Sequence, residues 1–215
     1  MDKTVFQITG AIVLSYLLGS VPFGVVIGKL FYKKDIREMG SKNIGATNIM
    51  RTFGMLPGVS VLLLDALKGL LSVVFFPGFF GLNVADNFSY LMLLTVSIFC
   101  GLAAIAGHNW PVFLGFKGGK GVATSVGIAL ALAPKEAGIA FAAFILLVLI
   151  TRYVSVGSIF GSIIFLTAIF VLEEPLPLML FGGLACVMII FRHIPNIKRL
   201  LNGTENKVWQ KKLPS

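Results

Sequence analysis

Seven apolar runs, separated by short polar segments, make up most of the chain. The first covers residues 4–28 without a charged side chain, which is long enough for a helix to cross the roughly 30 Å hydrocarbon core of a bilayer. The second run is broken only by Asp65 and Lys68. After the first run, the others cover residues 57–80, 87–107, 121–134, 137–151, 153–172 and 175–191. The pattern predicts an all-α polytopic integral membrane protein with one membrane-embedded domain over residues 1–215.

Composition agrees with this pattern. The chain is 57% hydrophobic and only 13% charged, whereas soluble domains carry about 25% charged residues. The net charge of +9 would suggest nucleic acid in a soluble protein. Here the charges are confined to the segments between apolar runs, so membrane topology and an anionic ligand explain them better, and we expect no nucleic-acid partner.

The first run differs from a secretory signal peptide in its charge order. Lys3 is the only basic residue before this run, whereas four basic residues follow it closely: Lys29, Lys33, Lys34 and Arg37. A signal peptide has its positive charge in front of the apolar region. We therefore expect a retained transmembrane helix.

The runs at 121–134 and 137–151 could form one long helix or a hairpin of two short helices, and the distribution of charge decides between them. With a hairpin there are seven spans, and one side of the membrane holds nearly all the basic residues: Lys29, Lys33, Lys34, Arg37, Lys42, Arg51, Lys117, Lys120, Arg152, Arg192, Lys198, Arg199, Lys207, Lys211 and Lys212. The other side holds only Lys3 and Lys135, with Asp2, Asp86, Glu136, Glu173 and Glu174. The positive-inside rule then predicts seven transmembrane helices, with the N-terminus outside and the C-terminus in the cytoplasm.

This topology brings the distinctive polar segments to the cytoplasmic side. They are residues 40–51, 107–124, 152–158 and 192–205. Four such segments meeting at one face predict a site at the cytoplasmic boundary of the membrane.

The sequence GFKGGKGVAT at 115–124 combines glycines with two lysines. Closely spaced glycine amides can form a nest for an anion, and the helix expected to begin near Gly121 would add its N-terminal dipole, with Lys120 supplying a full charge. Gly121 stands where a Walker A loop has Ser or Thr, so nucleotide binding is poorly supported. The alternative is a flexible, solvated connection between helices.

The segment 40–51 is dense in hydrogen-bonding side chains, and these suit polyols and phosphates. They are Ser41, Asn43, Thr47, Asn48 and Arg51. The alternative for this segment is an N-cap and turn before the second span.

The remaining polar candidates are fewer. Asp65 and Lys68 lie on one helical face within the second span and could be a structural ion pair or part of a site. His108 and His193, the only histidines, are expected at helix ends, where capping is the alternative to catalysis. Ser155 and Ser158 could be caps or ligand contacts. Without nearby cysteines or a carboxylate cluster we expect no metal site, and no Ser-His-Asp or G-x-S-x-G pattern occurs.

Taken together, these segments resemble the bacterial acyl-phosphate:glycerol-3-phosphate acyltransferase (PlsY) family. The matching patterns are GS-x-N-x-GATN-x-x-R at 40–51, D-x-x-KG at 65–69, GH-x-x-P-x-FL-x-FKGGKGVAT at 107–124 and H-x-x-N-IKRLL-x-G-x-E at 193–205. The resemblance covers nearly the whole chain. It implies a seven-helix fold in the bacterial cytoplasmic (inner) membrane, with membrane lipids around it and the active site on the cytoplasmic side.

The resemblance also implies an activity. A fatty acyl group would pass from acyl phosphate to the 1-hydroxyl of glycerol 3-phosphate, giving lysophosphatidic acid and phosphate, without a cofactor or metal. Acyl-CoA and acyl carrier protein are not expected as direct donors, since the H-x-x-x-x-D pattern of enzymes that use them is absent. A transporter of a phosphorylated metabolite is the alternative function.

The implied site residues follow from the same resemblance. Catalytic roles fall on Ser41, Arg51, Lys120, His193 and Asn196. Substrate binding falls on Asn43, Thr47, Asn48, Gly118, Gly119, Gly121 and Ser158. We add Lys68, His108 and Ser155 as further substrate-binding candidates. The three glycines would bring backbone N–H groups near the acyl phosphate.

Overall fold

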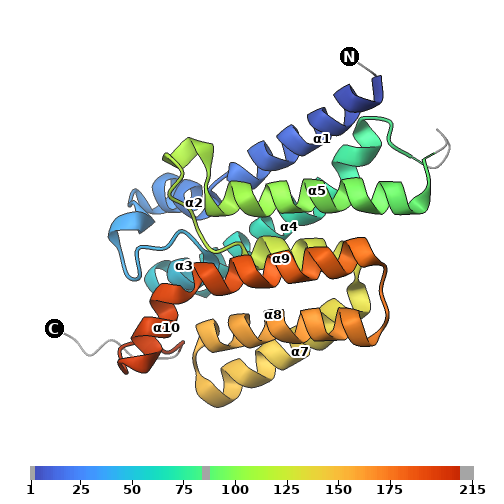
Figure 1. The fold of residues 1–215 in the computed structure, drawn as a ribbon. Coiled ribbons are helices and arrows are strands. Elements are labelled where there is room, and N and C mark those ends of the chain that lie inside the picture. Colours follow the sequence, from blue (N-terminus) through green and yellow to red (C-terminus); the bar gives the residue numbers. More distant parts are fainter. Residues whose placement is uncertain (1–2, 84–87, 209–215) are drawn as a thin grey trace.

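A computed structural model of the chain describes residues 3–83 and 88–208, and its ribbon is helical throughout (Figure 1). No strand occurs within these two ranges, so the all-α prediction is confirmed there. The predicted start of the third run at Asn87, and the charges Asp2, Asp86, Lys211 and Lys212, lie outside the described residues. The helices are α1 (Lys3–Ser20), α2 (Phe23–Tyr32), the 3-10 turn η1 (Ile36–Glu38), α3 (Ala46–Phe53), α4 (Met55–Phe79), α5 (Tyr90–Asn109), the 3-10 turn η3 (Val112–Leu114), α6 (Val122–Leu132), α7 (Pro134–Thr151), α8 (Val154–Val171), α9 (Leu176–Arg192) and α10 (Ile194–Leu201).

Four of the described helices are long and apolar enough to cross a membrane: α4, the α5 segment up to Leu114, α7 and α8. Two bent pairs, α1 with α2 and α9 with α10, raise the number of candidate spans to as many as six. Helix α6 is apolar but shorter. The prediction of several membrane-crossing helices is therefore confirmed, while a count of seven goes beyond what length and composition establish.

The first apolar run is two helices rather than the single helix that we predicted. Helices α1 and α2 meet at a bend of 40° around Val21 and Pro22. Proline has no N–H to donate and disfavours helical geometry in the residue before it, so the helix ends there. The carbonyl of Val21 accepts a hydrogen bond from Lys68 Nζ at 3.0 Å instead.

Lys68 also resolves the question left open for the second span. Its Nζ lies 2.7 Å from Asp65 Oδ1 one helical turn away, and both side chains are almost fully buried. His108 Nδ1, on α5, lies 3.6 Å from the same carboxylate oxygen. The ion pair on α4 therefore contacts both the bend between α1 and α2 and the end of α5. Burying either charge without its partner would cost free energy of folding.

The runs at 121–134 and 137–151 form separate helices, as charge counting predicted. Helix α6 begins beside Lys120, whose Nζ contacts Asn196 on α10, and α7 ends beside Arg152, whose carbonyl accepts from Val208 N. Both ends of the α6–α7 hairpin therefore lie near α10. Pro134 begins α7 directly after the short connection from α6. At the first position of a helix the backbone N–H has no partner within the helix, so proline can stand there without losing a hydrogen bond.

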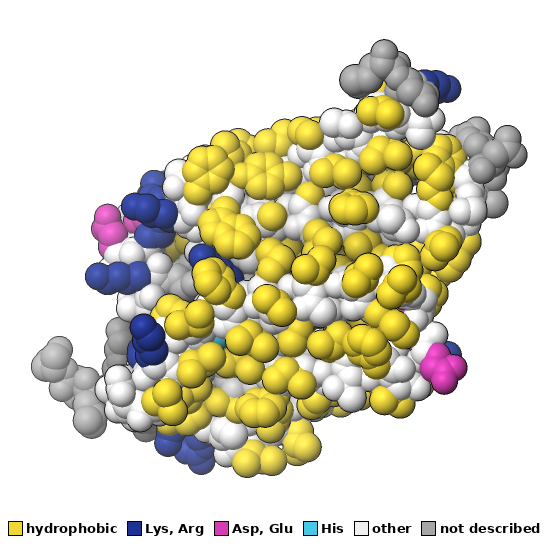
Figure 2. Space-filling model, viewed as in Figure 1, with side chains coloured by type: hydrophobic (Ala, Val, Ile, Leu, Met, Phe, Trp, Pro, Cys, Tyr) yellow, Lys and Arg dark blue, Asp and Glu magenta, His cyan; other side chains and the backbone are white. Residues whose placement is uncertain are grey.

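One end of the bundle collects the short helices and much of the charge. Helices α2, α3 and α10 lie at this end, which we call the α10 end, and the N-terminus lies at the other (Figure 1). Figure 2 shows hydrophobic side chains covering the middle of the visible face, with Lys and Arg gathered at the α10 end. An apolar belt with polar ends is the surface that a bilayer requires.

Helices α4 and α6 approach each other through glycine on both sides. A Cβ added at Gly127 would lie 1.8 Å from the carbonyl oxygen of Ala66, and one at Gly69 would lie 2.2 Å from that of Thr124. Contacts this short to backbone atoms cannot be relieved by rotating a side chain. Small residues at a helix crossing allow such close approach in membranes, and here they bring the start of α6 against α4.

We predict that Gly127→Ala lowers the thermal midpoint of the purified protein, because the added methyl group must push α6 away from α4. Overpacking of this kind costs about 1–3 kcal/mol, which exceeds the gain of up to about 1 kcal/mol in helix propensity. The measurement is thermal unfolding in one detergent. Gly138→Ala on α7 is the matched control, since a Cβ there meets nothing within 4 Å. Equal midpoints for the two variants would contradict the packing argument.

Candidate active site

A cavity of about 590 Å³ lies at the α10 end, and residues from all four predicted polar segments line it. The fold thus joins parts of the chain that are far apart in sequence, as the predicted topology required. Twelve of the predicted site residues are among those lining it: Ser41, Asn43, Thr47, Asn48, Arg51, His108, Lys120, Gly121, Ser155, Ser158, His193 and Asn196. Lys68, Gly118 and Gly119 are not among the lining residues.

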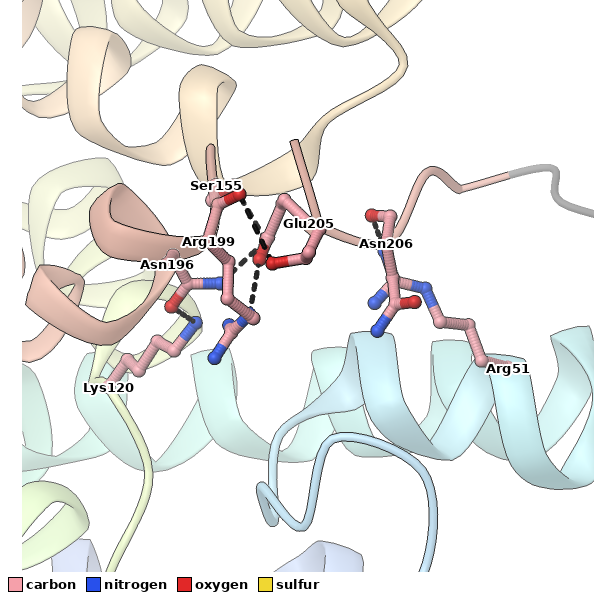
Figure 3. A network of polar contacts seen from close by, with 8 residues as sticks. Arg51, Lys120, Ser155, Asn196, Arg199, Glu205 and Asn206 are labelled. Atoms are coloured by element: carbon pink, nitrogen blue, oxygen red, sulfur yellow. Dashed lines mark hydrogen bonds and ion pairs between the residues drawn. The ribbon is translucent and has the colours of Figure 1, made fainter. Parts of the chain in front are cut away.

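A chain of hydrogen bonds connects Lys120 to Glu205 across this cavity (Figure 3). Lys120 Nζ donates to Asn196 Oδ1 at 2.6 Å, and Asn196 Nδ2 donates to Glu205 Oε1 at 2.7 Å. Ser155 Oγ donates to the same oxygen at 2.9 Å, and Arg199 Nε donates to Glu205 Oε2 at 2.7 Å. Because Glu205 can only accept, it fixes the Asn196 amide with its oxygen toward Lys120.

The electrostatics of the network favour an ionised Glu205. Burial alone would raise the pKa of its carboxyl group, but hydrogen bonds from Asn196, Arg199 and Ser155 outweigh burial and lower the pKa. Burial lowers the pKa of Lys120 to about 8; Glu205 opposes this shift, and Arg199, Arg51 and Arg192 add to it. Lys120 is therefore a cation near neutral pH that can lose its proton in mildly alkaline solution.

The chain that follows α10 returns across the cavity and holds Arg51. Arg51 Nη2 donates to the carbonyl oxygen of Asn206 at 2.8 Å (Figure 3). Two residues later, Val208 N donates to the carbonyl of Arg152 at 2.9 Å. The guanidinium at the end of α3 is thus positioned by the same segment that carries Glu205.

The loop before α3 is ordered by two asparagines. Asn48, which is buried, accepts from Ser41 N at 2.9 Å and donates to the carbonyl oxygens of Asn43 and Met39. Asn43 Oδ1 accepts from Gly45 N at 2.9 Å. These bonds set the path of the loop that brings Ser41 and Thr47 to the cavity wall. Asn43 and Asn48 therefore shape the wall through the backbone.

His193 lies between α9 and α10 and has a defined tautomer. Its Nδ1 is 2.8 Å from the carbonyl oxygen of Ile189, and a carbonyl can only accept, so Nδ1 carries the hydrogen. Nε2 then has a free lone pair. A neutral histidine in this tautomer can accept a hydrogen bond from a hydroxyl group of a ligand.

The glycine-lysine loop differs from the predicted nest. Gly119 N–H donates to the carbonyl oxygen of His108 at 3.0 Å, so this amide is already committed, and neither it nor Gly118 lines the cavity. Gly121 does line it and begins α6 with a left-handed φ of 76°, which glycine adopts without strain. In this structure the loop contributes the Lys120 side chain and the start of α6, rather than three glycine amides.

Three other predicted residues have partners within the protein. Lys68 is paired with Asp65 beneath the cavity, so its contacts are structural. Ser158 Oγ donates to the carbonyl of Val154 in its own helix at 2.9 Å, which leaves its oxygen as an acceptor. His108 is buried and faces Asp65. Lys68 and His108 thus support the floor of the site.

Sequence reasoning assigned no role to several lining residues. Arg199 and Glu205 were part of a matching pattern but received no role, whereas Arg192 was counted only as a basic tail charge. The available signal was their position in the polar segment that also carries His193 and Asn196. The polar lining residues without an assigned role are Lys42, Arg192, Arg199, Glu205 and Asn206, and Asp65, left open between an ion pair and a site, also lines the cavity.

The cavity also has an apolar wall, formed in part by Leu62, Phe144 and Phe191. Leu62 and Phe191 are 42% and 57% exposed on the outside of the bundle, so this wall continues toward the surface that faces lipid. Among the described residues, no group of three or more His, Cys, Asp or Glu side chains is placed to hold a metal ion.

Comparison with known proteins gives one consistent result. The family described as "Glycerol-3-phosphate acyltransferase" matches residues 9–203. "Glycerol-3-phosphate acyltransferase 2" of Moorella thermoacetica is 42% identical over 94% of this chain and 97% of its own length. The corresponding protein of Trichormus variabilis is 44% identical over 93% and 91%.

The structural comparison points to the same family. The crystal structure of PlsY, an integral membrane glycerol 3-phosphate acyltransferase, in its glycerol 3-phosphate form is 40% identical, with a TM-score of 0.83 over 93% of this chain and 94% of that one. The form described as the lysophosphatidic acid form has a TM-score of 0.79, at 40% identity over 94% of each chain.

We predict that Glu205→Gln lowers the thermal midpoint, because the amide cannot match the carboxylate's hydrogen bonds to Arg199, Asn196 and Ser155. Loss of charge-assisted bonds of this kind costs about 1–3 kcal/mol. Glu173→Gln is the control, since that exposed side chain has no hydrogen bond or ion pair within the described ranges. The result would contradict the network if both substitutions left thermal unfolding unchanged.

Proposed function

The chain belongs to the glycerol-3-phosphate acyltransferase family, and from that premise we propose that it transfers a fatty acyl group from acyl phosphate to the 1-hydroxyl of glycerol 3-phosphate. The products are lysophosphatidic acid and inorganic phosphate, so the reaction is a step of phospholipid biosynthesis. One observation carries the proposal. A single cavity has a polar wall rich in cations and an apolar wall that continues to the lipid-facing surface.

The polar wall suits two phosphorylated substrates. Arg51 and Lys120 supply positive charge, and Arg can hold a phosphate through two parallel hydrogen bonds. Ser41, His193 and Asn196 supply neutral hydrogen-bonding groups for a glycerol backbone. We assign catalytic roles to these five residues, with Asn43, Thr47, Asn48, Gly121, Ser155 and Ser158 completing the substrate pocket.

The chemistry needs positioning and charge stabilisation more than acid catalysis. The 1-hydroxyl oxygen attacks the acyl carbon, the bond from that carbon to the phosphate oxygen breaks, and the hydroxyl proton passes to the departing phosphate. The lining carboxylates are Asp65 and Glu205, and both are engaged by cationic groups. His193 Nε2 accepts a hydrogen bond from a substrate hydroxyl and orients it, while cations stabilise the departing phosphate.

The choice of donor rests on the shape and sequence of the site. An acyl phosphate places a small dianionic head beside Lys120 and Arg51 and its chain along the wall that includes Leu62 and Phe144. Five residues past His108 is Phe113, and five past His193 is Lys198, so neither histidine has the Asp of the H-x-x-x-x-D pattern. Acyl-CoA and acyl carrier protein are therefore not proposed as direct donors.

We also propose seven spans in the bacterial inner membrane, with the N-terminus outside and the C-terminus in the cytoplasm. The six candidate spans and the shorter α6 together make seven helical passes. Lys29, Lys33, Arg152 and the residues of α10 lie toward the α10 end, which the positive-inside rule assigns to the cytoplasm. The active site then opens to the compartment that holds soluble glycerol 3-phosphate.

The decisive assay uses the purified protein with synthetic acyl phosphate and glycerol 3-phosphate. We expect phosphate release that depends on both substrates, together with lysophosphatidic acid, and no product when acyl-CoA or acyl carrier protein replaces the donor. Product formed only from those two donors would overturn the choice of acyl phosphate. Uptake of glycerol 3-phosphate into liposomes without turnover would instead favour the alternative, a transporter.

We predict that Lys120→Ala and Arg51→Ala each reduce kcat/KM by about 100-fold or more, since each removes a positioned charge that stabilises a phosphate in the transition state. Lys117→Ala, three residues away in the same loop, is the control, because Lys117 is exposed and does not line the cavity. Thermal midpoints should stay close to that of the wild type. Near-normal rates in either alanine variant would remove that residue from the site.

We predict a fall in kcat/KM as the pH rises through about 8. The pKa of Lys120 is lowered to about 8, first by burial and further by Arg199, Arg51 and Arg192, against the opposing effect of Glu205. Because kcat/KM reports the free enzyme, loss of the ammonium charge weakens capture of the anionic substrate above that pH. Lys120→Arg should remove this alkaline limb from whatever activity remains. A pH profile that is flat up to pH 10 would contradict the assignment.

A further inference from the structure

Arg192, the last residue of α9, holds the backbone of the glycine-lysine loop. Its Nε donates to the carbonyl oxygen of Gly119 at 2.8 Å, and its Nη2 donates to that of Gly118 at 3.0 Å. The guanidinium also lies over the ring of Trp110, 5.7 Å from the centroid. The planar guanidinium of Arg192 thus binds two consecutive backbone carbonyls and packs against the ring of Trp110.

The opposite side of the loop rests on the end of α5. Gly119 N–H donates to the carbonyl oxygen of His108. A Cβ added at Gly118 would lie 2.2 Å from that same oxygen, and one at Gly119 would lie 2.2 Å from His108 Nε2. The two glycines therefore allow the loop to lie directly on His108. Arg192 from α9 and His108 from α5 hold the loop between them.

This arrangement has two consequences for the next residue, Lys120. Fixing the peptide groups of Gly118 and Gly119 restricts where the Lys120 backbone can lie, and its Nζ then reaches Asn196 on α10. Carbonyl oxygens carry partial negative charge and would repel a phosphate. Arg192, which also lines the cavity, donates to the carbonyl oxygens of the two residues that precede Lys120 and so offsets their negative charge.

We propose that Arg192 is a positioning residue that orders the loop at 115–121 and thereby places Lys120 for acyl-phosphate binding. The geometry requires arginine rather than any cation. A guanidinium offers parallel donors to two carbonyls at once, whereas a lysine ammonium at this distance acts as a point charge. The kinetic consequence rests on the proposed function, but the ordering of the loop does not.

The first experiment measures hydrogen–deuterium exchange of the loop in the substrate-free protein, for the wild type, Arg192→Lys and Arg192→Met. Both substitutions should increase exchange about tenfold or more at the amide of Gly119. Arg152→Lys and Arg152→Met are matched controls, because the Arg152 side chain is exposed and makes no hydrogen bond or ion pair within residues 3–83 and 88–208. Arg192→Lys keeps the charge, so it remains informative if Arg192→Met does not fold.

The second experiment measures steady-state kinetics with acyl phosphate and glycerol 3-phosphate. Arg192→Lys should raise the KM for acyl phosphate about tenfold, with a smaller change in kcat, since the loop must be ordered on binding. A general loss of folding would lower the fraction of active enzyme, and hence apparent kcat, without selectively raising this KM. Neither control should differ from the wild type.

The outcomes separate the two proposals. Unchanged exchange at the loop in both Arg192 variants would overturn the positioning role, whatever the kinetics. Increased exchange together with a raised KM for acyl phosphate supports it. If the wild-type protein does not use acyl phosphate, the proposed donor fails, while increased exchange in the variants would still establish that Arg192 orders the loop.

Discussion

The buried carboxylate of Glu205 is the interaction on which the site depends. It accepts hydrogen bonds from Asn196, Ser155 and Arg199, which come from α10 and α8, and the next residue binds Arg51 of α3 through its carbonyl. A carboxylate in this position balances part of the positive charge that an anion-binding site must bring together. Without it, the positive charges of Lys120, Arg51 and Arg199 would repel one another with no anion between them.

A second buried charge pair performs the corresponding task inside the bundle. Asp65 and Lys68 are paired on α4, and Lys68 also satisfies the carbonyl left free where Pro22 ends α1. The same carboxylate faces His108, on which the glycine-lysine loop rests. A break in the first span, an ion pair in the second and the floor of the active site are thus parts of one polar path. Such a path is costly in a membrane unless every charge in it has a partner.

Sequence alone predicted the features that follow from local pattern and charge. The apolar runs form helices. The excess of basic residues between them predicted that the segments containing Ser41, Lys120, Ser155 and Asn196 lie at the same end of the bundle, and they line one cavity at the α10 end. Features that depend on the direction of a side chain were missed. Arg192 looks like any basic residue at the end of a span, because nothing in its neighbours shows that its guanidinium turns toward Gly118 and Gly119.

The glycines illustrate why the remaining details were out of reach. A run of glycines beside lysine is typical of two arrangements. In one, the backbone amides face an anion; in the other, the backbone lies directly against another helix. Both arrangements require glycine at the same positions, so the sequence does not distinguish them. The structure favours the second for Gly118 and Gly119, since His108 leaves no room for a Cβ and Gly119 N–H has a partner. Under the proposed function, the positive charge that meets a phosphate then comes from side chains and from the start of α6. These cations are already held by Asn196 and by backbone carbonyls before a substrate binds, and under the proposed function such preorganisation is a main source of electrostatic catalysis.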